Sequence, residues 1–137
     1  MEGPRTCKKE EFKDAINLIN QIFRISQGHN PTMAEEFPLL LNEGNLENMR
    51  AIVEDGKVVS IVNYYITTVL IEGIPIKVAS VGAVCTDEKH RGKGYASLLL
   101  DDTEKRMKKQ GVDVVLISGD RNLYLEKEYC KAGCNQI

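Results

Sequence analysis

Three consecutive segments rich in valine, isoleucine, tyrosine and threonine constrain the fold of this chain most strongly. They span residues 49–54, 57–70 and 74–86. The first two are separated by Asp55-Gly56 and the last two by Glu72-Gly73, and such pairs are typical of the tight turns of β-hairpins. The sequence therefore predicts a three-stranded antiparallel meander.

Helices are predicted on both sides of the meander. Residues 10–26 carry apolar side chains at three- and four-residue steps, which is the spacing of one helical face. A second helix is predicted over residues 32–42, and a third over residues 94–110. On the third helix, spacings of one turn predict the ion pairs Asp101–Lys105, Asp102–Arg106 and Glu104–Lys108.

The segments after the third helix complete the predicted order. Residues 112–118 are an almost continuous apolar run, which predicts a strand buried on both faces and parallel to its predecessor across the helix. Residues 123–131 can form a last helix, which Gly133 ends. The order helix, helix, three strands, helix, strand, helix predicts an α/β (α+β) fold.

Charge and length exclude several classes of protein. With 18 Lys+Arg against 20 Asp+Glu, the 137-residue chain has a net charge of −2 and lacks the positive field that binds nucleic acid. The longest uncharged stretch, residues 58–71, is too short to span a bilayer, and the first ten residues lack the apolar segment of a secretion signal. We therefore expect a single cytoplasmic domain that binds neither nucleic acid nor membranes.

The cysteines indicate a reducing compartment. Cys7, Cys85, Cys130 and Cys134 show no spacing of a disulfide framework. Cys130 and Cys134 supply only two ligands to a metal that usually requires four, so no metal is expected. A small thiol-redox or zinc domain built on this pair is the alternative.

A polar loop at the start of the third helix is the most informative stretch for function. Residues 84–97 pass from a strand through glycines into a helix. Backbone N–H groups at a helix start have no intrahelical partner and lie at the positive end of the helix dipole, so they favour anions such as a diphosphate. Gly92 and Gly94 lack a Cβ that would block this approach, and Arg91 and Lys93 add positive charge. The alternative is ordinary turn chemistry.

The same residues give the chain a resemblance to a known family. The sequence Arg91-Gly92-Lys93-Gly94-Tyr95-Ala96 has the form Arg-x-x-Gly-x-Ala and follows a meander that ends in Val-x-Thr. Residues 129–134, Tyr-Cys-Lys-Ala-Gly-Cys, are similar to a late Tyr-x-x-x-Gly-Phe motif. On these features the chain resembles the GCN5-related N-acetyltransferase (GNAT) superfamily. The resemblance implies one domain over residues 1–137, with a mixed, mostly antiparallel sheet flanked by helices.

The resemblance also implies a cosubstrate and its binding residues. Acetyl-CoA would place its diphosphate on the backbone amides of Gly92, Lys93, Gly94, Tyr95, Ala96 and Ser97. Its pantetheine arm would run along Val84, Cys85 and Thr86, where the strand of residues 112–118 splays away and the arm takes the place of a missing strand. Asn122 would donate to the same arm. The alternatives are an ordinary strand end at Val84 and a helix N-cap at Asn122.

The implied chemistry is direct attack of an amine on the thioester, with a tyrosine that protonates the leaving thiolate. Tyr129 stands four residues before Gly133, as in the family motif. Tyr124 lies in a setting similar to that of the enhanced-intracellular-survival aminoglycoside acetyltransferases. Either tyrosine can instead be a packing residue. His90 has no partner evident in the sequence, which predicts an exposed loop residue.

One departure from the family pattern affects the expected activity. The family continues through two further strands that wall the acceptor cleft, whereas this chain ends at Ile137. The missing strands would belong to a longer protein or to another subunit, or the acceptor side would be absent. We therefore expect an N-acetyltransferase acting on a small-molecule or peptide amine, alone or as a homo-oligomer. The alternative is a non-catalytic acyl-CoA-binding or regulatory module.

Overall fold

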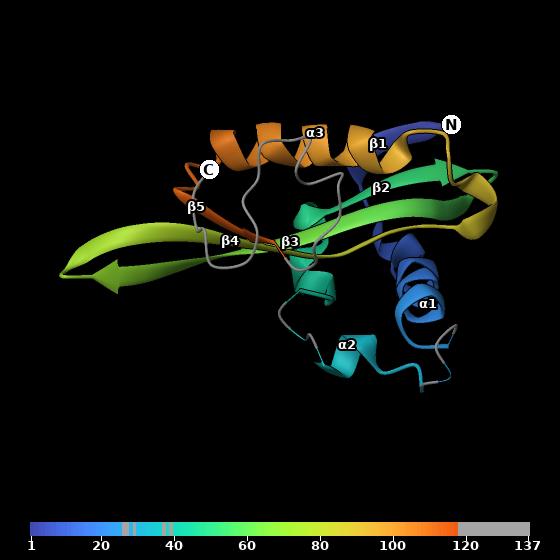
Figure 1. Cartoon of the computed structure of the whole chain (residues 1–137), viewed down its shortest axis with the longest axis horizontal. Coiled ribbons are helices and arrows are strands. Elements are labelled where there is room, and N and C mark those ends of the chain that lie inside the picture. Colours follow the sequence, from blue (N-terminus) through green and yellow to red (C-terminus); the bar gives the residue numbers. More distant parts are fainter. Residues whose placement is uncertain (26–27, 29, 37, 39, 118–137) are drawn as a thin grey trace.

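The computed structural model describes residues 1–25, 28, 30–36, 38 and 40–117. Its helices and strands are β1 (Glu2–Thr6), the 3-10 turn η1 (Lys9–Glu11), α1 (Phe12–Phe23), α2 (Met33–Glu36), η3 (Glu43–Asn48), β2 (Met49–Glu54), β3 (Lys57–Ile71), β4 (Ile74–Thr86), η4 (Glu88–His90), α3 (Tyr95–Lys109) and β5 (Val114–Ile117). The strands form one sheet in the order β1-β2-β3-β4-β5. Helix α3 lies along one face of this sheet, and α1 and α2 lie on the opposite side (Figure 1).

The predicted meander is confirmed. Strands β2, β3 and β4 pair antiparallel in sequence order, and only the end of β3 moves, by one residue to Ile71. Both connecting turns have two residues with positive φ, at 51° and 76° for Asp55-Gly56 and 52° and 79° for Glu72-Gly73. This is the type I′ geometry that matches the twist of a hairpin.

Strand β5 gives the sheet its mixed character. It pairs parallel to β4 from Val78↔Val114 to Val81↔Ile117, after the crossover through α3. The expected fold class is confirmed, because the sheet is mostly antiparallel and has helices on both faces. The predicted burial of this strand on both faces is wrong in one respect. Val115 is buried, but Leu116 on the other face is 42% exposed.

Two features of the N-terminal half differ from the prediction. No strand is predicted at the N-terminus, yet β1 pairs antiparallel with β2 at the sheet edge. Residues 2–6 lack apolar alternation, and an edge strand held by backbone bonds does not need it. The second helix is a single turn, Met33–Glu36, rather than residues 32–42. Pro38 follows it closely, and a proline there has no N–H for a continuing helix.

Helix α1 is confirmed with shorter bounds than residues 10–26, because η1 forms the first turn and the helix ends at Phe23. Its apolar face packs on the sheet with Ala15 and Ile19 fully buried. The buried side chain of Asn20 accepts a hydrogen bond from the backbone N–H of Met33 at 2.9 Å. This bond fixes the start of α2 against α1.

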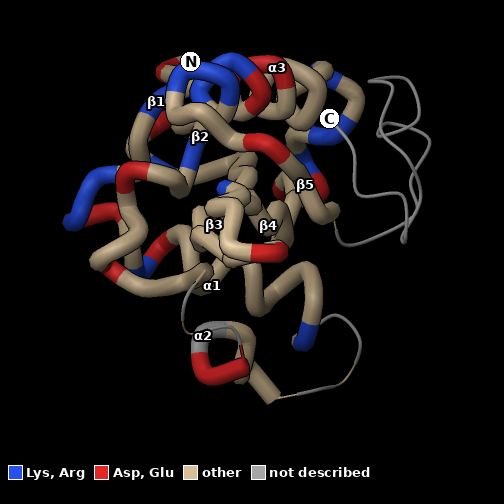
Figure 2. Tube along the Cα trace, turned by 90° about the vertical axis from the view of Figure 1, so that its left-hand side faces the viewer, with Lys and Arg blue, Asp and Glu red and all other residues tan. Residues whose placement is uncertain are grey.

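Helix α3 is held on its face of the sheet by polar anchors as well as by apolar packing. Arg50 on β2 donates to Asp102 at 2.7 Å, and Tyr64 on β3 donates to Gln110 at 2.7 Å. The predicted pair Asp102–Arg106 is therefore replaced by a pair with the sheet, whereas Glu104–Lys108 forms at 3.4 Å. Acidic and basic residues both occur along α3 (Figure 2). The anchors orient the N-terminus of α3, where the polar loop enters.

Candidate functional site

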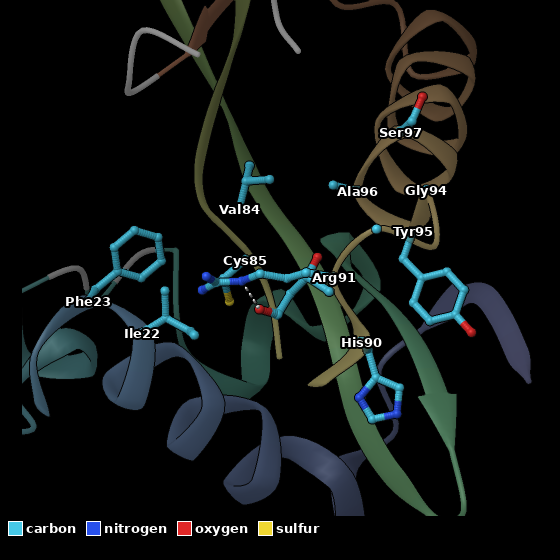
Figure 3. Close-up of a pocket in the computed structure, with 12 residues that line it drawn as sticks. Ile22, Phe23, Val84, Cys85, His90, Arg91, Gly94, Tyr95, Ala96 and Ser97 are labelled. Carbon is cyan, nitrogen blue, oxygen red and sulfur yellow. Dashed lines mark hydrogen bonds between the residues drawn. The ribbon is translucent and has the colours of Figure 1, made fainter. Parts of the chain in front are cut away.

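A hollow with a volume of about 550 Å³ lies at the N-terminus of α3 (Figure 3). Four parts of the chain line it: the end of α1, the last residues of β4, the loop that follows, and the first turn of α3. The lining residues are Ile22, Phe23, Val84, Cys85, Thr86, His90, Arg91, Gly92, Gly94, Tyr95, Ala96 and Ser97. Elements far apart in the sequence therefore meet around one opening.

The backbone amides at the start of α3 are available to a ligand. The first helical bond runs from the N–H of Leu98 to the carbonyl of Gly94 at 3.1 Å. Within the described part of the chain, the N–H groups of residues 92–97 donate to no protein acceptor. Gly92 and Gly94 have φ of 85° and 77°, and a Cβ on either would meet no atom within 4 Å. Uncommitted donors at the positive end of a helix form an anion site.

A bulge in β4 shapes the floor of the hollow. Ile61↔Cys85 and Asn63↔Gly82 are paired, so β4 has two residues where β3 has one. At the bulge Ala83 has φ of 51°, and its carbonyl accepts a hydrogen bond from the Asn63 side chain at 3.1 Å. Such an extra residue bends a strand and increases its twist. The expected splay of the next strand involves residues after Ile117 and lies outside the described residues.

A charged cluster beside the hollow ties the loop to β2. Glu54 accepts a hydrogen bond from the Tyr95 hydroxyl at 2.7 Å, and its carboxylate lies 3.3 Å from Lys93 and 3.5 Å from His90. The hydrogen bond with Tyr95 lowers the pKa of Glu54 and raises that of Tyr95. His90 also lies 2.9 Å from Asp87, so the predicted exposed loop residue is instead half-buried between two carboxylates.

Most of the predicted cofactor residues line this hollow. Val84, Cys85, Thr86, Arg91, Gly92, Gly94, Tyr95, Ala96 and Ser97 do so. The side chain of Lys93 extends to Glu54 instead, and the ring of Tyr95 points away from the hollow (Figure 3). Tyr124, Tyr129 and Asn122 lie outside the described residues. Their roles, and the binding roles of the lining residues, stay predictions.

Two residues that line the hollow and one that supports it are not predicted from the sequence. Ile22 and Phe23 are the last turn of α1, and they form the wall opposite the start of α3 (Figure 3). Both residues belong to the apolar stripe of α1, which predicts core packing and does not indicate that they line a hollow. Glu54 is the last residue of β2, and nothing in its sequence neighbourhood marks it as a partner of Tyr95.

The described residues provide neither a metal centre nor a membrane-spanning helix. In the described ranges, no group of three His, Cys, Asp or Glu residues is arranged to hold a metal ion. Cys7 and Cys85 are buried and form no disulfide, and Cys130 and Cys134 lie outside those ranges. Burial raises the pKa of Cys7 to about 11. Among the helices of the described residues, none has the length and apolar character that crossing a membrane requires.

Comparison with known proteins gives one family match. The family model for an acetyltransferase (GNAT) domain matches residues 4–131. No curated protein matches the sequence.

Solved structures share the fold at low sequence identity. A GNAT family acetyltransferase from Brucella melitensis, in complex with acetyl-CoA, has a TM-score of 0.74 at 19% identity, over 93% of this chain and 81% of that one. A probable N-acyltransferase from Enterococcus faecalis has a TM-score of 0.68 at 22% identity, over 89% of this chain. Eis1 from Mycobacterium abscessus has a TM-score of 0.61 at 18% identity, over 81% of this chain. This chain spans 30% of the length of the Enterococcus protein and 27% of Eis1.

Proposed function

This chain belongs to the acetyltransferase (GNAT) domain family, and from that premise we propose that it transfers the acetyl group of acetyl-CoA to the nitrogen of an amine. The observation that carries the proposal is the set of uncommitted amides at residues 92–97, which open into a hollow of about 550 Å³. A diphosphate satisfies these donors and the positive helix end together. The family membership supplies the ligand that carries this diphosphate.

The residues around the hollow have complementary tasks in this proposal. The amides of residues 92–97 hold the diphosphate oxygens, and the guanidinium of Arg91, which lines the hollow, adds a charge beside them. Val84, Cys85 and Thr86 continue from the bulge along the same hollow, where they support the pantetheine arm. Glu54 fixes the loop through Tyr95 and Lys93 and makes no contact with the diphosphate.

Acetyl-CoA supplies the thioester that makes the acetyl group transferable. In the transfer, the amine nitrogen forms a bond to the carbonyl carbon and the carbon–sulfur bond breaks. The amine loses a proton, and the departing thiolate gains one. We assign the proton donor to Tyr129, with Tyr124 as the alternative, and we assign a hydrogen bond to the pantetheine arm to Asn122.

Substitution of the two tyrosines separates their roles. If Tyr129 is the acid, Tyr129→Phe lowers kcat and leaves the affinity for acetyl-CoA unchanged, whereas Tyr124→Phe leaves both unchanged. The reverse pattern identifies Tyr124 as the acid. Unchanged kcat in both variants contradicts a tyrosine acid at either position.

A matched pair of glycine variants tests the diphosphate site. Gly94 and Gly56 have φ of 77° and 76°, and a Cβ on either meets no atom within 4 Å. Gly94→Leu and Gly56→Leu therefore carry a similar backbone strain of about 1–2 kcal/mol. Only the Gly94 variant places a side chain at the amides of residues 92–97. Gly56 is in the β2–β3 turn, outside the hollow.

Calorimetry with acetyl-CoA measures the outcome. We expect the Gly94 variant to lose affinity by about 100-fold or more, because its side chain fills phosphate space, and the Gly56 variant to bind as the wild type does. Wild-type affinity in the Gly94 variant would refute the placement. Thiol release on addition of an amine then tests transfer. Binding without thiol release assigns the non-catalytic acyl-CoA-binding role instead.

A further inference from the structure

A second hollow adjoins the first at Phe23. It has a volume of about 450 Å³ and lies between the end of α1, the start of α2 and the edge of the sheet formed by β4 and β5. Phe23 lines both hollows, and the neighbouring residues Ala83 and Val84 line the second and the first, respectively. A group bound in one hollow therefore lies next to a group bound in the other.

The walls of the second hollow are mostly apolar. Its apolar lining side chains come from α1, α2, β4, β5 and the segment between α2 and η3: Phe23, Met33, Leu40, Ala83 and Leu116. Such walls favour a ligand with an apolar or aromatic body, because the free energy of binding becomes more favourable when water leaves both apolar surfaces.

A row of neighbouring strand residues supplies the neutral polar groups. Tyr65 and Ser80 are direct partners across β3 and β4, and Ser80 and Leu116 are partners across β4 and β5. Partner side chains point to the same face of a sheet, so two hydroxyls and one leucine lie side by side at this hollow. Within the described residues, neither hydroxyl has a hydrogen-bond partner. They can form hydrogen bonds with one polar group of a ligand that is otherwise apolar.

The charge of the lining disfavours a polycation. Among the described residues that line the second hollow, none is a carboxylate, and Arg24 is the one charged residue. Its guanidinium donates to Glu36 at 2.7 Å and to the Phe23 carbonyl at 2.9 Å. A ligand with several ammonium groups would meet Arg24 and apolar walls here, and no described lining residue offers it a counter-charge to replace its lost hydration.

We propose that the second hollow is the acceptor site and that it selects a primary amine on an apolar, aromatic-sized body over a polycation such as a polyamine. The inference rests on the proposed function, because it assigns the acceptor of that transfer. The body packs on Leu116 beside Tyr65 and Ser80, and the amine lies beside Ala83, next to Val84 and the hollow that receives acetyl-CoA. Phe23 separates this body from the hollow that receives acetyl-CoA.

Two probes and two variants test the selection. The probes are 2-phenylethylamine, which has one amine on an aromatic ring, and spermidine, which is a polycation. Leu116→Glu adds a carboxylate to the lining, at a side chain that is 42% exposed. Val69→Glu is the matched control, because Val69 is 40% exposed, lies on β3 and lines neither hollow. Both variants change the net charge equally.

Thiol release from acetyl-CoA measures the transfer to each probe. For the wild type we expect kcat/KM for 2-phenylethylamine to exceed that for spermidine by about tenfold or more. Leu116→Glu should lower the 2-phenylethylamine value by about tenfold and raise the spermidine value, and Val69→Glu should change neither. Preference for spermidine in the wild type, or equal effects of the two variants, would overturn the inference.

A binding measurement distinguishes this inference from the proposed function. Saturation-transfer NMR detects 2-phenylethylamine on the protein without any turnover. A signal that Leu116→Glu removes and Val69→Glu keeps supports the site even if no thiol is released, and in that case the proposed transfer fails alone. Absence of this signal in the wild type overturns the acceptor site, and calorimetry with acetyl-CoA then reports on the first hollow separately.

Discussion

Replacing Asp102 by asparagine should destabilise the protein strongly, although the side chain keeps its shape. Arg50 donates to the two carboxylate oxygens of Asp102 at 2.7 and 3.2 Å, and to the hydroxyl of Thr6 at 2.7 Å. One guanidinium thus joins β2, β1 and α3. The Arg50 side chain is 8% exposed and that of Asp102 is 21% exposed. The substitution therefore leaves a buried cation without its counter-ion.

The expected size of this loss follows from the burial. Removing one partner of a buried ion pair costs about 3–5 kcal/mol, and the partial exposure of Asp102 reduces this to about 2–3 kcal/mol. An unfolding entropy of about 2.1 cal/mol/K per residue gives about 0.29 kcal/mol/K for 137 residues. The Asp102→Asn variant should therefore melt about 7–10 °C below the wild type.

A second variant on the same helix provides the control. Glu104 and Lys108 form an ion pair of 3.4 Å with side chains that are 30% and 67% exposed. Such a surface pair contributes about 0.3–0.5 kcal/mol, so Glu104→Gln should lower Tm by less than about 2 °C. Thermal unfolding followed by circular dichroism measures both variants. Equal shifts in Tm would refute the reasoning, because they would show that burial adds nothing to the pair with Arg50.

Three further predictions test other parts of the molecule. Burial raises the pKa of the Cys7 thiol from 9.0 to about 11, which lowers the fraction of reactive thiolate at about pH 8. Alkylation of Cys7 should therefore be about 100-fold slower in the native protein than in the urea-unfolded protein. Peptide mass spectrometry measures both rates, and equal rates contradict the burial. The hydrogen bond from Tyr95 lowers the pKa of Glu54, so it stabilises the fold above the usual value of 4.5 and this contribution is lost as pH falls through the lowered pKa. Tyr95→Phe should move that pKa back toward 4.5, and an unchanged carboxyl titration by NMR would count against the bond. Glu72 has φ of 52° in a type I′ turn, where asparagine is favoured, so Glu72→Asn should raise Tm by about 2–3 °C. A lower Tm would show that the Glu72 side chain has a role that the turn geometry does not reveal.

Local patterns were sufficient to predict the meander and α3. The turn pairs Asp55-Gly56 and Glu72-Gly73 have the positive φ angles that glycine and small polar residues favour, and they set the strand ends. The apolar stripe of α3 is buried at Leu99, Leu100 and Met107. Each of these signals lies within about a dozen adjacent residues and depends on backbone preference or on one periodicity.

Contacts between distant residues account for what was missed. Strand β1 forms because its backbone groups find the free edge of β2, and its sequence has no apolar alternation of its own. Asp102 had a basic residue one turn away at Arg106, yet it pairs with Arg50, where low exposure strengthens the interaction. Glu54 and Tyr95 are 41 residues apart in the chain and meet only when β2 lies beside the loop.

The sequence by itself determined the order of α1, the meander, α3 and β5, the hairpin turns, and the glycine loop that opens the first turn of α3. These depend on side-chain volume, backbone freedom and charge within short stretches of chain. Only the tertiary structure decided that Ile22 and Phe23 face the amides of residues 92–97, and that a second hollow, whose described lining residues include no carboxylate, adjoins the first. The packing of α1 and α3 on opposite faces of one sheet places these residues. Which distant residues meet depends on the free energy of packing the whole core, and no short stretch of sequence contains that information.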